Sequence, residues 1–537
     1  MTTGTAGELL RQVDARLAEG QIAAAVTLAE AAIGADSTSL IIHFRLATAY
    51  LKSGRYRDAL EVTLRAATLV AQTPAELVEL AQRLIYFSQA GAVRQLASGL
   101  LSRPVWNAAA EADFAALLSM VGEQVLAARL LDRAMAVTGP SPALVYNRSQ
   151  MHLYSGRMVE AESDLRQCLR LQPGMAKAHW ALSKLARAPA TDPELAAMRA
   201  LASRTAAGGQ DEVFLRFALF NRLDQLDRVD QAWEELERGC QIKRRLLSYD
   251  PAATRALFDA LVGAFPVIDA ASARQAPAVP ALPVTPIFII GMHRSGTTLL
   301  ERMLGNHSQV SEGGELYEFP AQLRWSIGRH FNGPCDLAVV EQMAQIDFAE
   351  VGRRYCDQVS WRAAGKEFLI DKLPSNFLNI GFIQRALPQA KVIHMRRNAM
   401  DTCFSNLKEL FSNACPYSYD QDELADYVGQ YQRLMTHWRS HAPGYVLDVS
   451  YEELTRNPRE QAERILAFCG LDWQPGCIDT GSNTRAVNTA SSAQVREPIH
   501  QRRIEAWRRY EARLATLAMA LAAAATGCAR DGNPATL

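Results

Sequence analysis

The sequence predicts two architectures in one chain: an α-helical solenoid built from repeats, and after it an α/β domain with a mainly parallel sheet. Glycines separated by multiples of 34 residues in the first half predict the repeats. The Ala/Pro-rich stretch Ala270–Pro286 opposes regular helix and predicts a connection between the two parts. After this stretch, short apolar runs alternate with helical periodicity, which is typical of a parallel sheet with right-handed crossovers.

The expected turns of the repeats lie at Gly20, Gly54, Ser88, Gly122 and Gly156, with Ser88 in place of a glycine. Small residues follow each turn at fixed positions, for example Ala59 and Ala66, and allow two antiparallel helices to pack closely. The stretches Gly54–Ala59 and Gly156–Ala161, together with Pro173, resemble the tetratricopeptide repeat (TPR). We therefore expect a TPR solenoid over residues 1–250.

Three segments depart from this pattern. Residues 73–106 fit it least, residues 187–211 predict a loop or a short helix, and Phe214–Arg245 predicts one more degenerate repeat. Stacked repeats form a curved solenoid with a concave face. That face can recruit a protein or peptide, or the solenoid can act as a rigid spacer or as a platform for a homo-oligomer. The sequence does not choose between these uses.

Composition excludes several classes of protein. The chain has 537 residues and a formal net charge of zero, which does not favour nucleic-acid or membrane binding. Its 9 cysteines are scattered without a CxxC pair, which speaks against a zinc site and a disulfide framework. The first residues lack a basic and then apolar leader, and Leu514–Ala525 is too short to span a bilayer. We expect a cytoplasmic protein without a transmembrane segment.

The second half predicts alternating elements. Strands are expected at Ile287–Ile290, Phe368–Asp371, Val392–Met395 and Tyr445–Val449. Helices are expected at Thr297–Asn306, Phe377–Ala386, Ala399–Phe411, Leu424–Ser440 and Arg459–Phe468. We expect a helix and linker over residues 251–285, the α/β domain over residues 286–512, and a final helix and tail over residues 513–537.

A strand, a glycine-bounded turn and a helix follow one another from Pro286 onward. The turn, Gly291-Met-His-Arg-Ser-Gly296, directs backbone N–H groups and a helix N-terminus at one point, which suits a phosphate or another oxyanion. The position of the usual P-loop lysine is Thr297, and the fixed positive charge is Arg294. The alternative is a tight turn with an exposed arginine, which leaves the coincidence of these features unexplained.

Three further groups have chemical potential, although each also has an ordinary structural explanation. Arg397 leaves a predicted strand and Ser405 lies early on the next helix, so both could bind a second phosphate. Glu315 is expected in the first turn of a helix, where a carboxylate stays ionised and could act as a base or merely cap the helix. Lys372 follows a strand and could neutralise a transferring group or face solvent.

Together these motifs resemble sulfotransferases that use 3′-phosphoadenosine 5′-phosphosulfate (PAPS). Gly291–Thr298 looks like their phosphosulfate loop, and the spacing from Arg397 to Ser405 is similar to their 3′-phosphate site. Gly313-Gly-Glu315, Asp371–Pro374 and Ser450–Pro458 look like the tyrosylprotein sulfotransferase branch. The chain as a whole resembles bacterial fusions of TPR repeats with such a domain. The resemblance implies a P-loop-like fold.

The resemblance also implies roles for individual residues. The donor-binding positions are His293, Arg294, Ser295, Gly296, Thr297, Thr298, Arg397, Ser405, Tyr451, Ser491, Ser492 and Arg496. Glu315 would deprotonate the acceptor hydroxyl, while Lys372 and Arg294 would stabilise charge on the sulfuryl group. A family lysine falls at Glu497, so the adjacent Arg496 is expected to replace it. His293 only lines the loop, and His307 is expected to pack or cap rather than to act as a base.

The resemblance therefore implies a PAPS-dependent sulfotransferase, and we expect that it requires no metal. A tyrosine of a protein or peptide recruited by the repeats is the favoured acceptor. A small phenol or a carbohydrate hydroxyl would need the same loop and base, so both remain alternatives. A TPR scaffold with a degenerate nucleotide domain is a second alternative. An ATP-dependent kinase is disfavoured by the missing P-loop lysine.

Overall fold

The computed structural model of the chain describes residues 5–185, 191–266, 282–481, 485 and 499–530. The chain divides into two compact units. The first combines Met1–Pro140 with Tyr317–Trp361, and the second combines Ser141–Leu316 with Arg362–Leu537. Repeat helices thus belong to both units, and the expected domain boundaries at residues 250, 285 and 512 remain predictions. Among the residues described, no helix is both long and apolar enough to cross a membrane.

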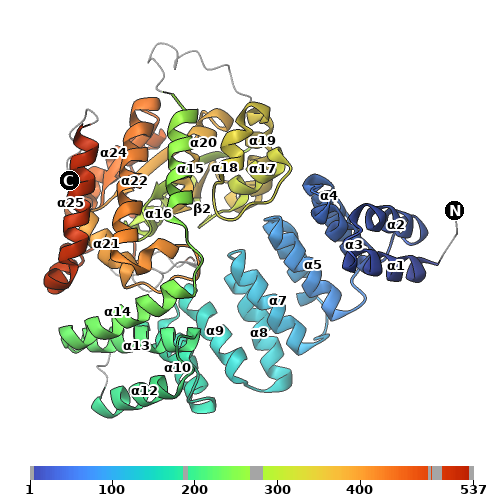
Figure 1. The fold of residues 1–537 in the computed structure, drawn as a ribbon, viewed down its shortest axis with the longest axis horizontal. Coiled ribbons are helices and arrows are strands. Elements are labelled where there is room, and N and C mark those ends of the chain that lie inside the picture. The colour runs from blue at the N-terminus through green and yellow to red at the C-terminus, as the bar shows by residue number, and fades with distance from the viewer. Residues whose placement is uncertain (1–4, 186–190, 267–281, 482–484, 486–498, 531–537) are drawn as a thin grey trace. The chain divides into compact units, whose positions relative to one another are not determined.

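The repeats of the first unit are paired helices (Figure 1). Their bounds are α1 Ala6–Ala18, α2 Ile22–Ala35, α3 Leu40–Lys52, α4 Tyr56–Ala66, α5 Pro74–Tyr86, α6 Ala90–Leu101, α7 Ala108–Met120 and α8 Gln124–Thr138. Turn residues Gly20, Gly54 and Gly122 have φ values of 73°, 76° and 84°, which glycine adopts without strain. Ser88 adopts φ 56° in the least regular repeat. The expected register of the repeats is confirmed.

A segment from the second half of the chain belongs to this first unit. It contains α17 Glu318–Ile327, α18 Leu337–Glu341 and α19 Phe348–Val359. The Arg57 Nε of α4 donates to the carbonyl of Trp325 (2.8 Å). Gln358 donates to the carbonyl of Ser88 (2.7 Å), the turn residue between α5 and α6. Residues 317–361 are therefore held by the first repeats.

The second unit begins with further repeat helices. Their bounds are α9 Pro142–Tyr154, α10 Met158–Leu171, α11 Ala176–Leu185, α12 Asp192–Arg204, α13 Gln210–Gln225, α14 Val229–Arg245 and α15 Pro251–Ala264. The expected extra pair near Phe214–Arg245 is confirmed as α13 and α14. Residues 187–211, expected as a loop or short helix, contain the 13-residue α12. Thr191 and Glu194 form a capping box at its start, which fixes where the helix begins.

The sheet of the second unit has five parallel strands. They are β1 Thr285–Gly291, β2 Val310–Glu312, β3 Phe368–Asp371, β4 Lys391–Arg396 and β5 Val446–Ser450, in the order β2-β3-β1-β4-β5. The four expected strands are confirmed within a residue or two at each end. The edge strand β2 was not expected because its 3 residues are too few to show a period.

Helices cover both faces of this sheet. The helices of this α/β part are α16 Thr297–Gly305, the 3₁₀ helix η4 Pro374–Asn379, α20 Ile380–Ala386, α21 Ala399–Leu407, α22 Gln421–His441, α23 Tyr451–Arg456, α24 Pro458–Cys469, the 3₁₀ helix η8 Ala506–Leu514 and α25 Ala515–Arg530. Among them, η8 packs on α21 and α25 packs on α22. Ile287 and Ile289 of β1 pack with Leu300 of α16 and Ile465 of α24. Successive side chains of a strand alternate between the two faces of the sheet. The buried Phe288 therefore packs on the face opposite to that of Ile287 and Ile289.

Helix α15 is fastened to the α/β part by an aromatic cluster. Phe265 follows α15 and is fully buried. Its ring centroid lies 5.0 Å from that of Phe382 in α20 and 5.3 Å from that of Trp438 in α22, with edge-to-face geometry in both pairs. A Cβ atom added at Gly381 would lie 2.5 Å from the ring of Phe265. Gly381 therefore permits the close approach of α15 and α20.

We predict that Gly381→Ala destabilises the chain, although alanine ordinarily favours a helix over glycine. The added methyl group would overlap a ring that is itself packed on two sides, at a cost of about 1–3 kcal/mol. Gly263→Ala is the matched control, because its Cβ would meet nothing within 4 Å. It should leave the free energy of unfolding unchanged or raise it by up to about 1 kcal/mol. Denaturant unfolding measures both, and equal effects would contradict the packing.

Candidate active site

The expected site residues of the second unit gather where the parallel strands end. The anion loop follows β1, Lys372 follows β3, Arg397 follows β4 and Tyr451 follows β5. Glu315 lies three positions beyond the last residue of β2. Parallel sheets bind ligands in the crevice at this edge because the carboxyl ends of all strands meet there. The fold thus brings together residues that are far apart in the sequence.

The glycines of the anion loop are required by close contacts. A Cβ at Gly291 would lie 2.6 Å from the carbonyl oxygen of Met395 in β4. A Cβ at Gly296 would lie 2.5 Å from the ring of Tyr451, and the φ of Gly296 is 108°. The loop is therefore pressed against the ends of β4 and β5, and α16 begins directly after it. The first N–H groups of a helix have no intrahelical partner and can bind an anion.

Ser295 and Arg294 occupy the middle of this loop. The Ser295 hydroxyl is buried and has no hydrogen-bond partner among the described residues. Arg294 adopts φ 67°, which is uncommon for a residue with a side chain. Its Nε donates to the Ser405 hydroxyl (3.2 Å), and its guanidinium lies 3.7 Å from a carboxylate oxygen of Glu409. Arg294 thus connects the two expected phosphate positions.

Arg397 and Ser405 form the second expected phosphate position. Arg397 donates to the carbonyl oxygens of Arg294 (3.2 Å) and Arg503 (2.6 Å), and its guanidinium lies 4.7 Å from the centre of the Tyr451 ring. Its Nε is buried without a partner among the residues described. Ser405 lies in the last turn of α21, later than expected, because the helix ends at Leu407.

Glu315 and Lys372 form an ion pair. Lys372 is fully buried, and its Nζ donates to Glu315 Oε1 (2.7 Å), while 29% of the Glu315 side chain is exposed. The backbone N–H of Lys372 also donates to the carbonyl of Gly314 (2.8 Å). The expectation that Glu315 lies in a helix first turn is wrong, because α17 begins at Glu318. The positive charge beside Glu315 comes from Lys372 instead of a helix terminus.

Glu301 is a buried acid that sequence reasoning missed. It lies on α16, accepts a hydrogen bond from the Gly314 N–H (2.9 Å) and lies 3.9 Å from Lys372 Nζ. Burial raises the pKa of Glu301 to about 7, although the charge of Lys372 opposes this shift. The sequence carries one signal of this burial: Glu301 lies among the apolar residues of the helical pattern Leu299–Leu304. Glu301 holds the backbone next to Glu315 in place.

Two histidines near the site, His293 and His307, make packing contacts and hydrogen bonds within the fold. The His293 ring lies edge-to-face with Phe411 at 5.9 Å, and burial lowers the pKa of His293, which keeps it neutral. The His293 carbonyl accepts from Asn406 (2.7 Å), so His293 lines the loop as expected. His307 is fully buried, and its Nε2 bonds to the carbonyl of Asp472 (3.0 Å), which confirms a packing role.

Thr297 and Thr298 are buried at the start of α16. The remaining expected donor-binding residues, Ser491, Ser492 and Arg496, lie outside the residues that the structure describes. Within those described residues, no three His, Cys, Asp or Glu side chains gather as metal ligands. The arrangement can hold an anion at two points and places one carboxylate beside a buried ammonium group.

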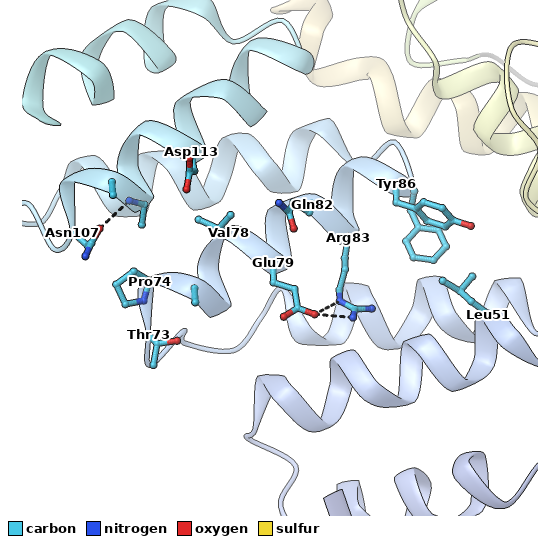
Figure 2. Close-up of a pocket in the computed structure, with 14 residues that line it drawn as sticks. Leu51, Thr73, Pro74, Val78, Glu79, Gln82, Arg83, Tyr86, Asn107 and Asp113 are labelled. Carbon is cyan, nitrogen blue, oxygen red and sulfur yellow. Dashed lines mark hydrogen bonds and ion pairs between the residues drawn. The ribbon is translucent and has the colours of Figure 1, made fainter. Parts of the chain in front are cut away.

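A separate pocket lies among the repeats of the first unit (Figure 2). It has a volume of about 840 Å³ and is lined by residues of α5 and α7 together with Leu51 of α3. Arg83 and Glu79 form an ion pair in its wall (2.8 Å), and the exposed ring of Tyr86 lies beside them. None of the expected site residues lines this pocket. Its lining combines apolar side chains with acidic and basic ones.

We predict that Glu301 makes stability depend on pH. A carboxyl group whose pKa is raised by folding stabilises the native state below its unfolded value near 4.5, and this contribution is lost as pH rises through about 7. Glu301→Gln removes the titration, so its melting temperature should fall less between pH 5 and 8 than that of the wild type. Glu463→Gln, on the exposed face of α24, should follow the wild type. Parallel curves for Glu301→Gln would contradict the raised pKa.

Two family models match the chain. A model of the sulfotransferase family matches residues 286–475, and a tetratricopeptide-repeat model matches residues 16–84. The chain is 30% identical over 331 residues to an uncharacterized protein from Aquifex aeolicus (strain VF5), a match that covers 60% of this chain but only 43% of that protein. It is 26% identical over 226 residues to a putative protein-tyrosine sulfotransferase from Caenorhabditis briggsae, which covers 41% of this chain and 80% of that one.

Two solved structures, among others, are similar to parts of this chain. The sulfotransferase domain from the Synechococcus PCC 7002 olefin synthase is 23% identical, covers 44% of this chain and 91% of its own, and has a TM-score of 0.32. The C-terminal part of a TPR repeat-containing protein from Cytophaga hutchinsonii is 16% identical, and the match covers 43% of this chain and 93% of that solved chain, with a TM-score of 0.32. By its sequence matches, the chain combines tetratricopeptide repeats with a sulfotransferase domain.

Proposed function

We propose that the chain is a PAPS-dependent sulfotransferase that moves a sulfuryl group to an acceptor hydroxyl, with a protein or peptide tyrosine as the favoured acceptor. One observation carries the proposal. The Glu315–Lys372 ion pair lies at the same sheet edge as an anion loop whose buried Ser295 hydroxyl has no hydrogen-bond partner in the described part of the chain. The α/β domain of residues 286–512 would perform the chemistry. Residues 1–250 would recruit the acceptor or a partner.

The donor would be held by the loop and by the end of β4. Arg294 and the backbone and hydroxyls through Thr298 suit the phosphosulfate, because a helix N-terminus and a fixed cation converge there. Arg397 and Ser405 suit the 3′-phosphate. The Arg397 Nε, which finds no acceptor among the residues described, is a donor that such a group would satisfy. Tyr451 would lie near the nucleotide. Ser491, Ser492 and Arg496 are proposed on the resemblance alone.

PAPS would supply an activated sulfuryl group whose transfer, like that of a phosphoryl group, depends on positioning and electrostatics. A phenol has a pKa of about 10, so its hydroxyl needs a base in the transition state at neutral pH. Glu315 would accept this proton as the acceptor oxygen bonds to sulfur. Lys372 and Arg294 would stabilise negative charge on the sulfuryl oxygens and on the bridging oxygen whose bond to sulfur breaks.

Tyrosine is favoured as the acceptor because relatives matching 41% of this chain are described as protein-tyrosine sulfotransferases in Caenorhabditis briggsae and Gallus gallus. The pocket of about 840 Å³ on the repeats is large enough for several side chains of a bound segment. It combines apolar wall with both signs of charge, which suits a polypeptide better than a small phenol. Labelled PAPS offered with tyrosine peptides, phenol or sugars would distinguish these acceptors.

We predict that 3′,5′-adenosine bisphosphate (PAP) raises the melting temperature of the chain and that ADP does not. A ligand that binds only the folded state stabilises it by an amount that grows with the logarithm of the ratio of its concentration to its dissociation constant. PAP offers a phosphate to both anion positions, whereas ADP lacks the group for Arg397 and Ser405. Differential scanning fluorimetry with both nucleotides at equal concentration measures this. Equal shifts would favour a kinase-like site, and no shift with PAP would favour a scaffold.

We predict that Glu315→Gln abolishes most turnover and leaves PAP binding intact. The amide cannot accept a proton, and general-base catalysis contributes about 10²–10⁴-fold in rate. Glu367→Gln is the matched control, because this exposed glutamate precedes β3 at the opposite end of the sheet. It should turn over at the wild-type rate. Full activity in Glu315→Gln would reject the role of Glu315 as the base.

A further inference from the structure

Three charged side chains connect the repeats of the second unit to the anion loop. Lys184, near the end of α11, donates from Nζ to Glu409 Oε1 at 2.6 Å. The other oxygen of Glu409 lies 3.7 Å from the guanidinium of Arg294. One carboxylate therefore lies between a lysine of the repeat region and the only arginine of the loop sequence Gly291–Thr298.

These charges are poorly screened by solvent. The side chains of Arg294 and Glu409 are 7% and 8% exposed, and that of Lys184 is 27% exposed. Burial disfavours ionisation of Glu409, but Lys184 and Arg294 more than offset this, and the pKa of Glu409 lies below its usual value. Glu409 is thus a carboxylate at neutral pH. Coulomb interactions among partly desolvated groups at these distances are far stronger than in water.

Lys184 is held in place by its surroundings. Its ammonium group lies 4.9 Å from the centre of the Trp180 ring on the same helix. The neighbouring Ser183 accepts from Asn221 at its hydroxyl (2.9 Å) and from Gln225 at its carbonyl (3.1 Å), both on α13. The end of α11 is therefore tied to the next helix pair. The position of the Lys184 charge is set by the repeat fold.

The two contacts of Glu409 have opposite effects on the positive charge that Arg294 presents to a ligand. The contact with Arg294 reduces this charge, and the contact with Lys184 draws Glu409 away from Arg294. A carboxylate beside a guanidinium neutralises charge that an incoming oxyanion would otherwise use. The short contact to Lys184 keeps the carboxylate on the lysine side, at 2.6 Å against 3.7 Å to Arg294. Without the lysine, the attraction of Glu409 would be directed to Arg294. The charge available at the anion loop then depends on a residue of the repeats.

We propose that Lys184 is a positioning residue for the anion loop, which acts through Glu409 to keep the charge of Arg294 available to the sulfuryl donor. This inference rests on the proposed function, because it assumes that Arg294 binds the donor. It assigns part of the active site to helix α11, whereas the sulfotransferase-family match begins at residue 286. The repeats would then support the chemistry directly, in addition to any partner that they recruit.

The test compares Lys184→Met, Glu409→Gln and the double variant in the full-length chain, with PAP as the probe. Lys184→Met should weaken PAP binding about tenfold, because Glu409 is released towards Arg294. Glu409→Gln should bind PAP as tightly as the wild type or more tightly, since a negative charge is lost. The double variant should recover most of the affinity that Lys184→Met loses. Lys184→Arg keeps the charge and should rescue binding.

Arg244→Met is the matched control, because Arg244 of α14 forms an equally short ion pair with Glu423 of α22 (2.6 Å) that does not contact the loop. It should leave PAP affinity unchanged. Calorimetry measures affinity, and steady-state kinetics with labelled PAPS should show the Lys184→Met effect in the donor KM. An additive loss in the double variant would mean that Lys184 is merely structural. A wild-type chain that binds no PAP would overturn the proposed function, whereas normal PAP binding by Lys184→Met would overturn this inference alone.

Discussion

The parallel direction of the five strands determines where the residues of the candidate active site lie. In a parallel sheet, a crossover segment joins each strand to the next, so all strands end at the same edge of the sheet. The residues that follow each strand therefore lie along that edge. β1 is buried along its length and lies at the centre, which puts the anion loop in the middle of that edge. Arg397 and Tyr451 reach the loop from one side, and Lys372 with Glu315 from the other. Segments that are far apart in the sequence therefore meet at the site.

Backbone proximity then determines which residues can form the loop. The carbonyl of Met395 and the ring of Tyr451 leave no room for a Cβ at Gly291 or Gly296. This crowding presses the N-terminus of α16 against two neighbouring strand ends. The buried Ser295 hydroxyl and Arg397 Nε remain without protein partners among the described residues, which is costly unless a ligand satisfies them. A polar edge of this kind is suited to a multiply charged anion.

The sequence was sufficient for the elements with a strong local signal. The apolar runs of β1, β3 and β4 and the glycine-bounded turn predicted both the sheet and the loop. The repeat period also predicted a turn at Ser88, which adopts φ 56°. Features that depend on tertiary contacts were missed or misplaced. The short strand β2 is defined by its pairing with β3, and Glu315 precedes its helix rather than opening it. Partners 225 positions apart, such as Lys184 and Glu409, have no local pattern to reveal them.

The ion pairs that join repeat helices to the α/β part limit how this chain could be recombined. Arg244 of α14 binds Glu423, and Arg509 binds Asp224 of α13 (2.9 Å), so exchanging the last repeats would strand charges on both partners. Repeats before Ser141 belong to the other compact unit and avoid this penalty. These first repeats are constrained in another way, because Arg57 donates a hydrogen bond to the carbonyl of Trp325. A chimera with new N-terminal repeats would need a matching 317–361 segment. The first repeats and this segment would therefore have to be exchanged together.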